Sequence, residues 1–379
     1  MKRTPLFAAH QRLGGKLIEF GGWEMPVQYT SITDEHLAVR QAAGLFDISH
    51  MGEVWVEGPL AEGFLNLVLT NDLRKLAPGQ GQYTLMCNPA GGVIDDLYAY
   101  RLAAEQYLLI INAARIADDV AWLEQRLARF GPPQGVRLLN ASEATGALAV
   151  QGPRVAAFIN QCFAGPFAGG AAVARATDLK KNQVAGTRFG GHQAWVSRTG
   201  YTGEDGFELV APAEAIPAIW ERLLQLGRPH GLKPAGLGAR DTLRTEVCYP
   251  LYGHELNENT TPLEAGLGFF VALDKGEFVG RPVLAAQKLG GVSRKLVAFK
   301  MTGKSAPPRP HYAIWSQGPA AEKLGEVASG TQSPSLGVGI GMGYVPPQFA
   351  QPQTPLAIEI RGQRAPALVV PKPIYRKAD

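Results

Sequence analysis

Between residues 83 and 112 the chain alternates short apolar runs with turn residues. The runs YTLMCN, VIDDLYAYRL and YLLIIN are rich in β-branched and aromatic residues, and PAGG and AAEQ separate them. Runs of this kind joined by short turns predict antiparallel strands, here a three-stranded β-meander. The next segment, 116–130, instead has apolar residues spaced to share one helical face: Val120, Leu123, Leu127 and Phe130. The pattern therefore predicts a meander followed by a helix.

Similar patterns continue along the chain. A hairpin is predicted where TRFGGHQAWVSR turns at Gly190-Gly191, and helices are predicted at AEAIPAIWERLLQLG and GARDTLRTEV. The stretches VEGPLAEGFLN from Val56 and VQGPRVAAFIN from Val150 align at five positions, as expected for two subdomains of similar build. After about Arg281 the texture changes to short β segments divided by Pro and Gly, which predicts a small β-barrel or sandwich: KLVAFKM, HYAIWS, GVGIGMGYV, LAIEI and ALVV.

A chain of 379 residues is too long for one simple core, so two or three domains are expected. Helices mixed with antiparallel strands indicate an α+β fold with a C-terminal β-barrel. We expect a first domain at 1–145 that carries the meander, a second at 146–280, and the barrel at 281–379. The first two domains can interleave.

Composition narrows the class of protein. The chain is 46% hydrophobic and 18% charged, as in globular proteins. Its net charge of +4 comes without a basic run longer than Lys180-Lys181, so we expect no nucleic-acid partner. An anionic small molecule or an acidic protein partner fits this bias. Three scattered cysteines form no Cys/His cluster, so we expect no metal site and a reducing compartment.

Two further signals concern location. The N-terminal stretch MKRTPLFAAHQRLGG has no apolar core segment, so we expect no signal peptide. The longest uncharged window, 155–174, is rich in Gly and Ala and less apolar than a membrane span. We therefore expect a cytoplasmic protein that does not enter a membrane.

The common nucleotide and hydrolase motifs are absent. No G-x-x-x-x-G-K-[ST] or G-x-S-x-G occurs, and GVGIGMG lacks both the spacing and the following helix of a dinucleotide fingerprint. The seven histidines form no H-x-x-x-H pattern. His50, beside Met51, is the most interesting of them, although a lone His in such a loop is more often structural.

Carboxylates are the remaining candidates. Asp95 and Asp96 stand next to each other inside the second strand of the meander, although Asp is depleted in strands. Neighbouring residues of a strand point to opposite faces, so Asp96 shares its face with Ile94, Tyr98 and Tyr100. The sequence therefore places one carboxylate on an aromatic face of the sheet.

Two interpretations of this pair stay open. Both carboxylates could cap turns or pair with Arg101. Alternatively, one of them lines an apolar, aromatic cavity and stabilises a cation or a protonated amine. Asn112, which closes the run YLLIIN, is either a second polar group of this site or a strand-terminating residue.

The segments RTGYTGEDGFE and GARDTLR contain the other candidates. Glu204 and Asp205 lie between glycines and are expected to be solvated turn residues. Glu208 instead lies inside the strand FELV. Arg240 and Arg244 are four residues apart and share a helix face, where surface salt bridging is the plain expectation for each.

Together these segments resemble the aminomethyltransferase, or T-protein, family of the glycine cleavage system. The resemblance runs in order from residue 3 to about residue 345, and nine stretches carry it: RTPLFAAH, GGKLIEFGGWEMPVQY, EHLAVRQAAGLFDISHMGEV, GGVIDDLYAY, RTGYTGEDGFE, GLGARDTLR, PLYGHEL, LDKGEFVGR and ASGTQSPSLGVGIGMGYV.

The resemblance implies a three-domain cloverleaf around a central funnel that binds tetrahydrofolate. It also implies the reaction. An aminomethyl group arrives on the lipoyl arm of a partner, H-protein, and the products are ammonia, 5,10-methylenetetrahydrofolate and the reduced arm.

By the same resemblance, Asp96 is the central carboxylate near the folate nitrogens that receive the one-carbon unit. Tyr83, Asn112 and Tyr201 are similar to folate-pocket residues of the family. A carboxylate held in a dry pocket stabilises developing positive charge, and it can also relay a proton. Both roles of Asp96 stay open.

Three further residues follow from the resemblance. Glu208 is expected to accept hydrogen bonds from the pterin ring. Arg240, and Arg376 in the tail PIYRK, are expected to face the anionic side of the folate or the arriving partner. The segment RTEVCYP departs from the family pattern and leaves Cys248 without a family role.

Two other functions remain alternatives. One is a folate-dependent demethylase of a methylated amine or sulfonium compound, which needs no lipoyl partner. The other is a non-catalytic folate-binding assembly or tRNA-maintenance protein, whose K-G-C-Y-x-G-Q-E stretch is only partly matched by EVCYPLYGHEL here.

Overall fold

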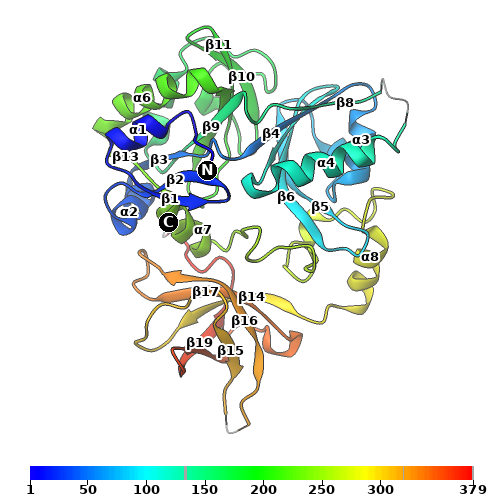
Figure 1. Ribbon diagram of the computed structural model, residues 1–379, viewed down its shortest axis with the longest axis vertical. Coiled ribbons are helices and arrows are strands. Elements are labelled where there is room, and N and C mark those ends of the chain that lie inside the picture. Colours follow the sequence, from blue (N-terminus) through cyan, green and yellow to red (C-terminus); the bar gives the residue numbers. More distant parts are fainter. Residues whose placement is uncertain (132–134, 319, 378–379) are drawn as a thin grey trace. The chain divides into compact units, whose positions relative to one another are not determined.

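The computed structural model describes residues 1–131, 135–318 and 320–377 (Figure 1). The chain forms two compact units, one of residues 1–86 with 95–240 and one of residues 87–94 with 241–379. Each unit has its own sheets. The division into three domains at residues 145 and 280 stays a prediction.

A six-stranded sheet forms the core of one half of the first unit (Figure 1). Its order is β10 (Val184–Phe189), β11 (His192–Ser197), β12 (Gly206–Pro212), β9 (Thr145–Gln151), β3 (Ala43–Asp47) and β13 (Leu232–Pro234). Neighbouring strands are antiparallel except β13 and β3, which run parallel. The predicted hairpin is confirmed as β10–β11, where Gly190 and Gly191 both have positive φ, the conformation that two-residue hairpin turns require.

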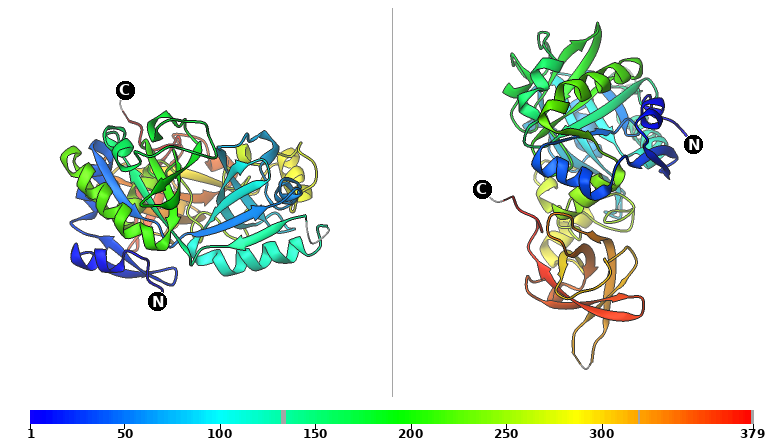
Figure 2. Two further views of the ribbon diagram at one scale, coloured as in Figure 1. Left: turned by 90° about the horizontal axis from the view of Figure 1, so that it is seen from above. Right: turned by 90° about the vertical axis from the view of Figure 1, so that its left-hand side faces the viewer.

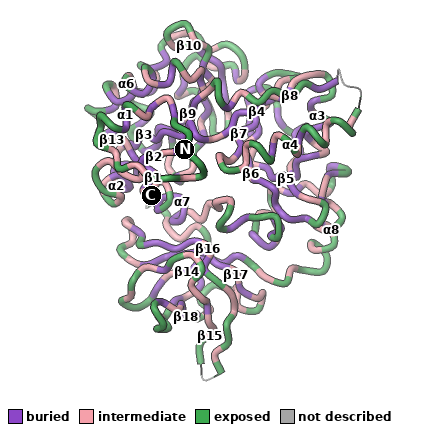
Figure 3. Tube along the Cα trace, viewed as in Figure 1, coloured by how far each residue is buried: buried purple, intermediate pink, exposed green. Residues whose placement is uncertain are grey.

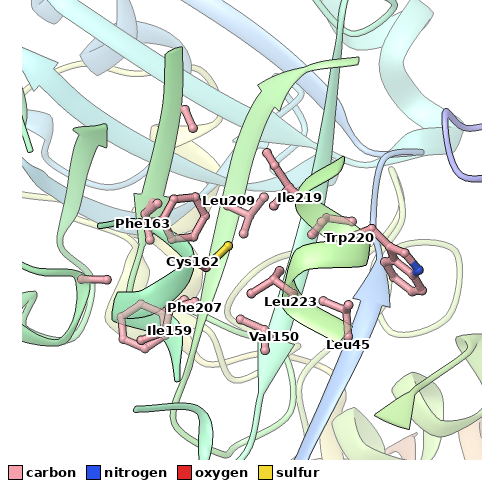
Figure 4. Packing of buried hydrophobic residues seen from close by; sticks show 14 of the residues in the cluster. Leu45, Val150, Ile159, Cys162, Phe163, Phe207, Leu209, Ile219, Trp220 and Leu223 are labelled. Carbon is pink, nitrogen blue, oxygen red and sulfur yellow. The ribbon is translucent and has the colours of Figure 1, made fainter. Parts of the chain in front are cut away.

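Helices cover this sheet and close its core. They are α1 (Phe7–Arg12), α2 (Ile32–Gln41), α5 (Ile159–Cys162) and α6 (Ile216–Gly227), and a small hairpin of β1 (Lys16–Phe20) and β2 (Trp23–Gln28) accompanies them. The strands β3 and β9 are buried almost throughout (Figure 3). Trp220 and Leu223 of α6 pack against Leu45 and Val150 of the sheet (Figure 4). The predicted helix at 213–227 is thus confirmed, with a 3-10 turn before Ile216.

The second sheet of the first unit contains the predicted meander. Its order is β5 (Gln80–Cys87), β6 (Val93–Ala103), β7 (Gln106–Ile111), β4 (Gly52–Glu57) and β8 (Arg137–Asn140). The helices α3 (Ala61–Val68) and α4 (Ile116–Leu127) accompany it, and Phe64 contacts Phe130 with ring centroids 5.4 Å apart. The predicted helix is confirmed, although it ends at Leu127 and a turn continues to Phe130.

Aromatic side chains pack the two sheets of the first unit against each other. Tyr98 and Tyr100 of β6 belong to one cluster with Trp55 of β4, Val184 of β10 and Trp195 of β11. The rings of Trp55 and Trp195 are 6.2 Å apart. The β6 face that carries Tyr98 and Tyr100 therefore looks toward the other sheet, and Asp96 shares that face because strand residues alternate.

The second unit ends in a closed barrel (Figure 1; Figure 2, right). Its strand order is β14 (Lys295–Met301), β17 (Gly339–Val345), β16 (Lys323–Gln332), β15 (Ala313–Ser316), β18 (Pro355–Ile360) and β19 (Gln363–Val370), and β19 pairs with β14 to close it. The helix α8 (Arg281–Gly290) precedes it, and α7 (Leu237–Glu246) crosses from the first unit to the second. The predicted α+β fold with a C-terminal β-barrel is confirmed.

The barrel explains the glycine-rich stretch GVGIGMG. Gly341 lies on β17, where a Cβ would come within 2.5 Å of the Phe299 ring and 2.6 Å of the Ser329 carbonyl oxygen. Close packing of β17 against its neighbours therefore accounts for this glycine. Within the described residues, no helix has the length and apolarity to cross a membrane.

The core of the six-stranded sheet leads to a stability prediction. Leu223 is fully buried on α6, so Leu223→Ala should lower the free energy of unfolding by about 2–5 kcal/mol through lost burial and a residual cavity. The same truncation at Leu139, which is 45% exposed on β8, should cost about 0.5 kcal/mol or less. Urea unfolding of both variants measures the difference, and equal losses would contradict this account of the core.

Candidate functional site

Asp96 lies on β6 between a tyrosine and an asparagine. Its Oδ2 accepts a hydrogen bond from the Tyr83 hydroxyl of β5 at 2.9 Å, and its Oδ1 accepts one from the Asn112 amide at 3.0 Å. Asp96 is half-buried, whereas Asp95 beside it is fully buried. Arg101 pairs instead with Glu62 at 2.9 Å. The interpretation of the aspartates as partners of Arg101 is therefore wrong.

Asn112, directly after β7, joins both aspartates. Its backbone N–H donates to Asp95 Oδ2 at 3.0 Å, and its side-chain Nδ2 donates to Asp95 Oδ1 at 2.8 Å. The same Nδ2 lies 3.0 Å from Asp96 Oδ1 and from the Asp96 carbonyl oxygen. The end of one strand thus supplies donors to carboxylates on opposite faces of its neighbour.

The environment of Asp96 shifts its ionisation. Burial, and then the charge of Asp95, raise the pKa of Asp96 to about 7, while the hydrogen bonds from Tyr83 and Asn112 lower it in part. Burial and the nearby Asp96 charge hold the pKa of Tyr83 well above its usual range. Tyr83 therefore stays a hydroxyl donor, and Asp96 changes charge near neutral pH.

Glu208 lies on β12 of the facing sheet. Its Oε2 accepts a hydrogen bond from Thr199 at 2.6 Å, which leaves Oε1 without a partner in the part of the chain that the structure describes. Tyr100 of β6 is 2.9 Å from the Thr199 hydroxyl and donates to Ser197 at 3.1 Å. Because Tyr100 shares its strand face with Asp96, this network connects the Asp96 face of one sheet to Glu208 of the other.

The sequence does not indicate Ser197 or Thr199 as site residues, and it places Tyr100 on the Asp96 face without giving it a role. The period-two alternation on β6 was the available signal for Tyr100, because it places that residue on the face of Asp96. No sequence signal pairs Thr199 with Tyr100, since the contact joins two sheets.

Tyr201 and Arg240 meet beside this region. The Arg240 guanidinium lies over the Tyr201 ring, 4.5 Å from its centroid, a cation–π arrangement. Tyr201 also interacts electrostatically with Tyr83, so it lies on the Tyr83 side of the site. Arg240 in turn lies near His50: burial first, and then the Arg240 charge, lower the pKa of His50 to about 4. His50 is therefore a neutral, buried imidazole at physiological pH.

The loop that carries Tyr201 is held by buried polar contacts. Arg40 of α2 pairs with Glu204 at 3.0 Å and donates to the Thr202 carbonyl oxygen at 2.7 Å. Thr202 also donates to Gln151 at 3.0 Å. The Glu204 side chain is only 4% exposed, so the expectation of a solvated turn residue is wrong at this position.

Two further predicted arginines, Arg244 and Arg376, lie in the second unit. Arg244 is buried in the second unit, where it pairs with Glu255 at 2.9 Å and donates to Ser329 at 2.7 Å. Arg244 also pairs with Asp241 of the same helix at 2.7 Å, so the expected salt bridge forms, but its guanidinium is buried and not at the surface. Arg376 is exposed in the second unit, next to Tyr375, whose N–H donates to the Glu246 carbonyl oxygen. Its role stays a prediction.

The first unit thus contains six of the seven predicted site residues. Asp96, Tyr83 and Asn112 form one hydrogen-bonded group, Tyr201 with Arg240 forms a second, and Glu208 lies on the facing sheet. Two carboxylates, hydroxyl donors and a cation around a partly buried region can bind a flat heterocycle with N–H groups and stabilise a developing cation.

Comparisons with known proteins point to one family along nearly the whole chain. The GCVT N-terminal domain matches residues 6–275, and the glycine cleavage T-protein C-terminal barrel domain matches residues 294–376. The chain is 45% identical over 379 residues to an aminomethyltransferase of Geobacillus sp. (strain WCH70), with all of both chains covered. It is 44% identical over 380 residues to an aminomethyltransferase of Desulfitobacterium hafniense (strain Y51), covering 100% of this chain and 99% of the relative.

A solved structure shows the same fold. The glycine cleavage system aminomethyltransferase T from Bartonella henselae superposes with a TM-score of 0.88 at 33% identity, covering 99% of this chain and 98% of that one.

The hydrogen bond from Tyr83 leads to a prediction about ionisation. Tyr83→Phe removes a donor that stabilises the charged carboxylate, so the pKa of Asp96 should rise above about 7. NMR titration of ¹³C-labelled aspartate carboxyl groups measures it. Tyr107→Phe makes the same change on β7, where the hydroxyl contacts Glu62, and should leave the Asp96 titration in place. A fall of the Asp96 pKa in Tyr83→Phe would overturn the assigned donor.

Proposed function

Because the chain belongs to the glycine cleavage T-protein family and is an aminomethyltransferase, we propose that it takes an aminomethyl group from the lipoyl arm of H-protein. In the proposed reaction the chain releases ammonia and forms 5,10-methylenetetrahydrofolate. The observation that best supports this reaction is the environment of Asp96, whose carboxylate accepts hydrogen bonds from two donors and has a pKa of about 7.

We propose Asp96 as the catalytic residue. Transfer of an aminomethyl carbon from sulfur to a folate amine develops positive charge at that carbon, and a fixed carboxylate in a partly dry site stabilises such charge better than water does. Tyr83 and Asn112 hold the two Asp96 oxygens in place, so little reorganisation is needed during the reaction. Asp96 serves this role in its charged form, which predominates above about pH 7.

We propose that tetrahydrofolate binds between the Asp96 face of β6 and Glu208 of β12. Tetrahydrofolate supplies the amines that accept the one-carbon unit. The Oε1 of Glu208, which has no partner within the described ranges, is suited to accept hydrogen bonds from the neighbouring N–H groups of a pterin. Tyr201 offers an aromatic face, and Arg240 offers positive charge for the anionic end of the folate. A contact of Arg376 with the folate or with the partner stays a prediction from the sequence.

The other interpretations are less well supported. The relatives reported above do not favour a demethylase or a non-catalytic folate-binding protein. Each is an aminomethyltransferase, and the match covers almost all of its length. The three cysteines are free thiols, which fits a reducing, cytoplasmic setting. We propose that location together with a transient complex with lipoylated H-protein.

Substitution of Asp96 tests the proposed chemistry. Asp96→Asn keeps the shape of the side chain and removes its charge, so ammonia release from aminomethyl-loaded H-protein should slow by about 10²–10⁴-fold. Tetrahydrofolate binding should change by less than about tenfold, because Asp96 acts mainly on the developing charge. Glu105→Gln removes one exposed charge from the β6–β7 turn and serves as the control. Equal losses of the ammonia-release rate and of tetrahydrofolate affinity would contradict the assignment of Asp96 as the catalytic residue.

Glu208 tests the proposed folate pocket. Glu208→Gln replaces an acceptor-only group by one that also donates, so tetrahydrofolate affinity should fall by about 10–100-fold, the value of a charged hydrogen bond. The rate at saturating folate should change much less. Isothermal titration calorimetry with tetrahydrofolate measures the affinity, and Glu214→Gln, just after β12 and paired with His192 at the surface, is the matched control. Unchanged affinity in Glu208→Gln would move the pterin site elsewhere.

A further inference from the structure

A third aspartate stands behind the Asp95–Asn112–Asp96 group. Asp119 lies in the first turn of α4, and its side chain is fully buried. Its carboxyl interacts with the Asp95 carboxyl of β6. No N–H or hydroxyl group in the described part of the chain donates to either Asp119 oxygen. Arg115 comes within 3.6 Å of Asp119 Oδ1, too far for a hydrogen bond of good geometry.

The contact between Asp95 and Asp119 needs one proton. Two bare carboxylates in a buried contact repel each other, and a hydrogen bond between them forms only when one carries hydrogen. Asp95 already accepts two N–H groups from Asn112, at 3.0 and 2.8 Å, and these favour its charged form. Asp119 has no such donors among the described residues, so the proton belongs on Asp119.

Burial raises the pKa of both carboxyls, and the contacts with Asp119 and Asn112 lower that of Asp95 in part. Burial, and then the Asp95 charge, raise the pKa of Asp119 to about 11, although Arg115 lowers it in part. Asp118, the exposed neighbour on the same helix turn, pairs with Arg115 at 2.9 Å. Among the described residues, Tyr83 is a further titratable group that contacts Asp96, and Tyr201 acts electrostatically on Tyr83.

We propose that Asp119, as a neutral acid donating to Asp95, is a positioning residue that keeps Asp95 a carboxylate and thereby sets the charge state and orientation of Asp96. This proposal rests on the proposed function of Asp96. It assigns a specific task to Asn112, whose amide lies between Asp95 and Asp96 and donates to both. An amide donor passes no proton from one carboxylate to the other, so the buried pair acts on Asp96 through charge and geometry.

The pH dependence of the proposed reaction tests the inference. The midpoint of the acid limb in the wild type should lie near pH 7, where Asp96 ionises. Asp95→Asn removes the neighbouring charge and should move this midpoint down by about one pH unit or more. Asp119→Leu removes the donor, so Asp95 takes up a proton itself, and the midpoint should move in the same direction.

Asp119→Asn distinguishes a neutral acid from a charged one. The Asn amide can donate to Asp95 as the protonated acid does, so its midpoint should stay near that of the wild type. Glu124→Gln, an exposed charge removal on the same helix, should also leave the midpoint in place. The profiles are measured as ammonia release from aminomethyl-loaded H-protein with tetrahydrofolate in excess.

Two results would overturn the inference. Equal downward shifts in Asp119→Asn and Asp119→Leu would mean that Asp119 is ionised in the native protein. Unmoved midpoints in both Asp95→Asn and Asp119→Leu would mean that the pair does not act on Asp96. In either case a loss of activity in Asp96→Asn would still support the proposed function, whereas full activity in Asp96→Asn would contradict the proposed function itself.

Protein stability gives a readout that needs no activity. A carboxyl with a folded pKa of about 11 and an ordinary unfolded value of 3.8 binds a proton only in the folded state over the range between them. Its contribution is complete below the unfolded pKa and is lost as pH rises toward the folded pKa. Between pH 5 and 9 the unfolding equilibrium constant of the wild type should therefore rise about tenfold per pH unit relative to Asp119→Asn. Urea unfolding followed by tryptophan fluorescence measures it, and parallel curves would contradict the proton on Asp119.

Discussion

The need to satisfy buried carboxylates governs the candidate site. Burying an ionised carboxylate oxygen within a protein costs free energy unless hydrogen-bond donors reach that oxygen. Asn112 meets this need because it follows β7, so its backbone N–H and its side chain both face β6. One residue thereby supports Asp95 on one face and Asp96 on the other. The strand register around the meander is constrained by this arrangement, since a slip by one residue would exchange the two aspartates.

The two sheets of the first unit share this constraint. Aromatic residues of β6 pack against the facing sheet, and the Tyr100 hydroxyl reaches the Ser197–Thr199 pair that holds Glu208. The packing that stabilises the unit therefore also sets where Glu208 lies relative to the Asp96 face. The Arg40–Glu204 pair does the same for the loop of Tyr201, because it anchors that loop from α2. Stability and site geometry depend on the same side chains.

The three neighbouring aspartates differ in burial and in hydrogen-bond donors, so they differ in how readily they ionise. Asp96 is half-buried with two donors and ionises near neutral pH. Asp95 has donors but is fully buried, and Asp119 is fully buried without N–H or hydroxyl donors among the described residues. Neighbouring acids with such unequal surroundings separate into a charged group and a neutral one. In the proposed reaction this separation leaves Asp96 as the group whose charge changes in the working pH range.

The sequence by itself determined the meander, its two adjacent aspartates, the hairpin at Gly190-Gly191 and the C-terminal barrel, because these follow from local alternation and turn chemistry. It also placed Asp96 on the aromatic face of β6, since strand periodicity is independent of the rest of the fold. Only the tertiary structure decided that Asn112 donates to both aspartates, that Thr199 donates to Glu208 while contacting Tyr100, and that Glu204 and Asp119 are buried. Each of these depends on contacts between residues far apart in sequence. Strand alternation predicts which face of the sheet a side chain occupies. Whether a carboxylate on that face is charged depends on the residues that the tertiary structure brings next to it.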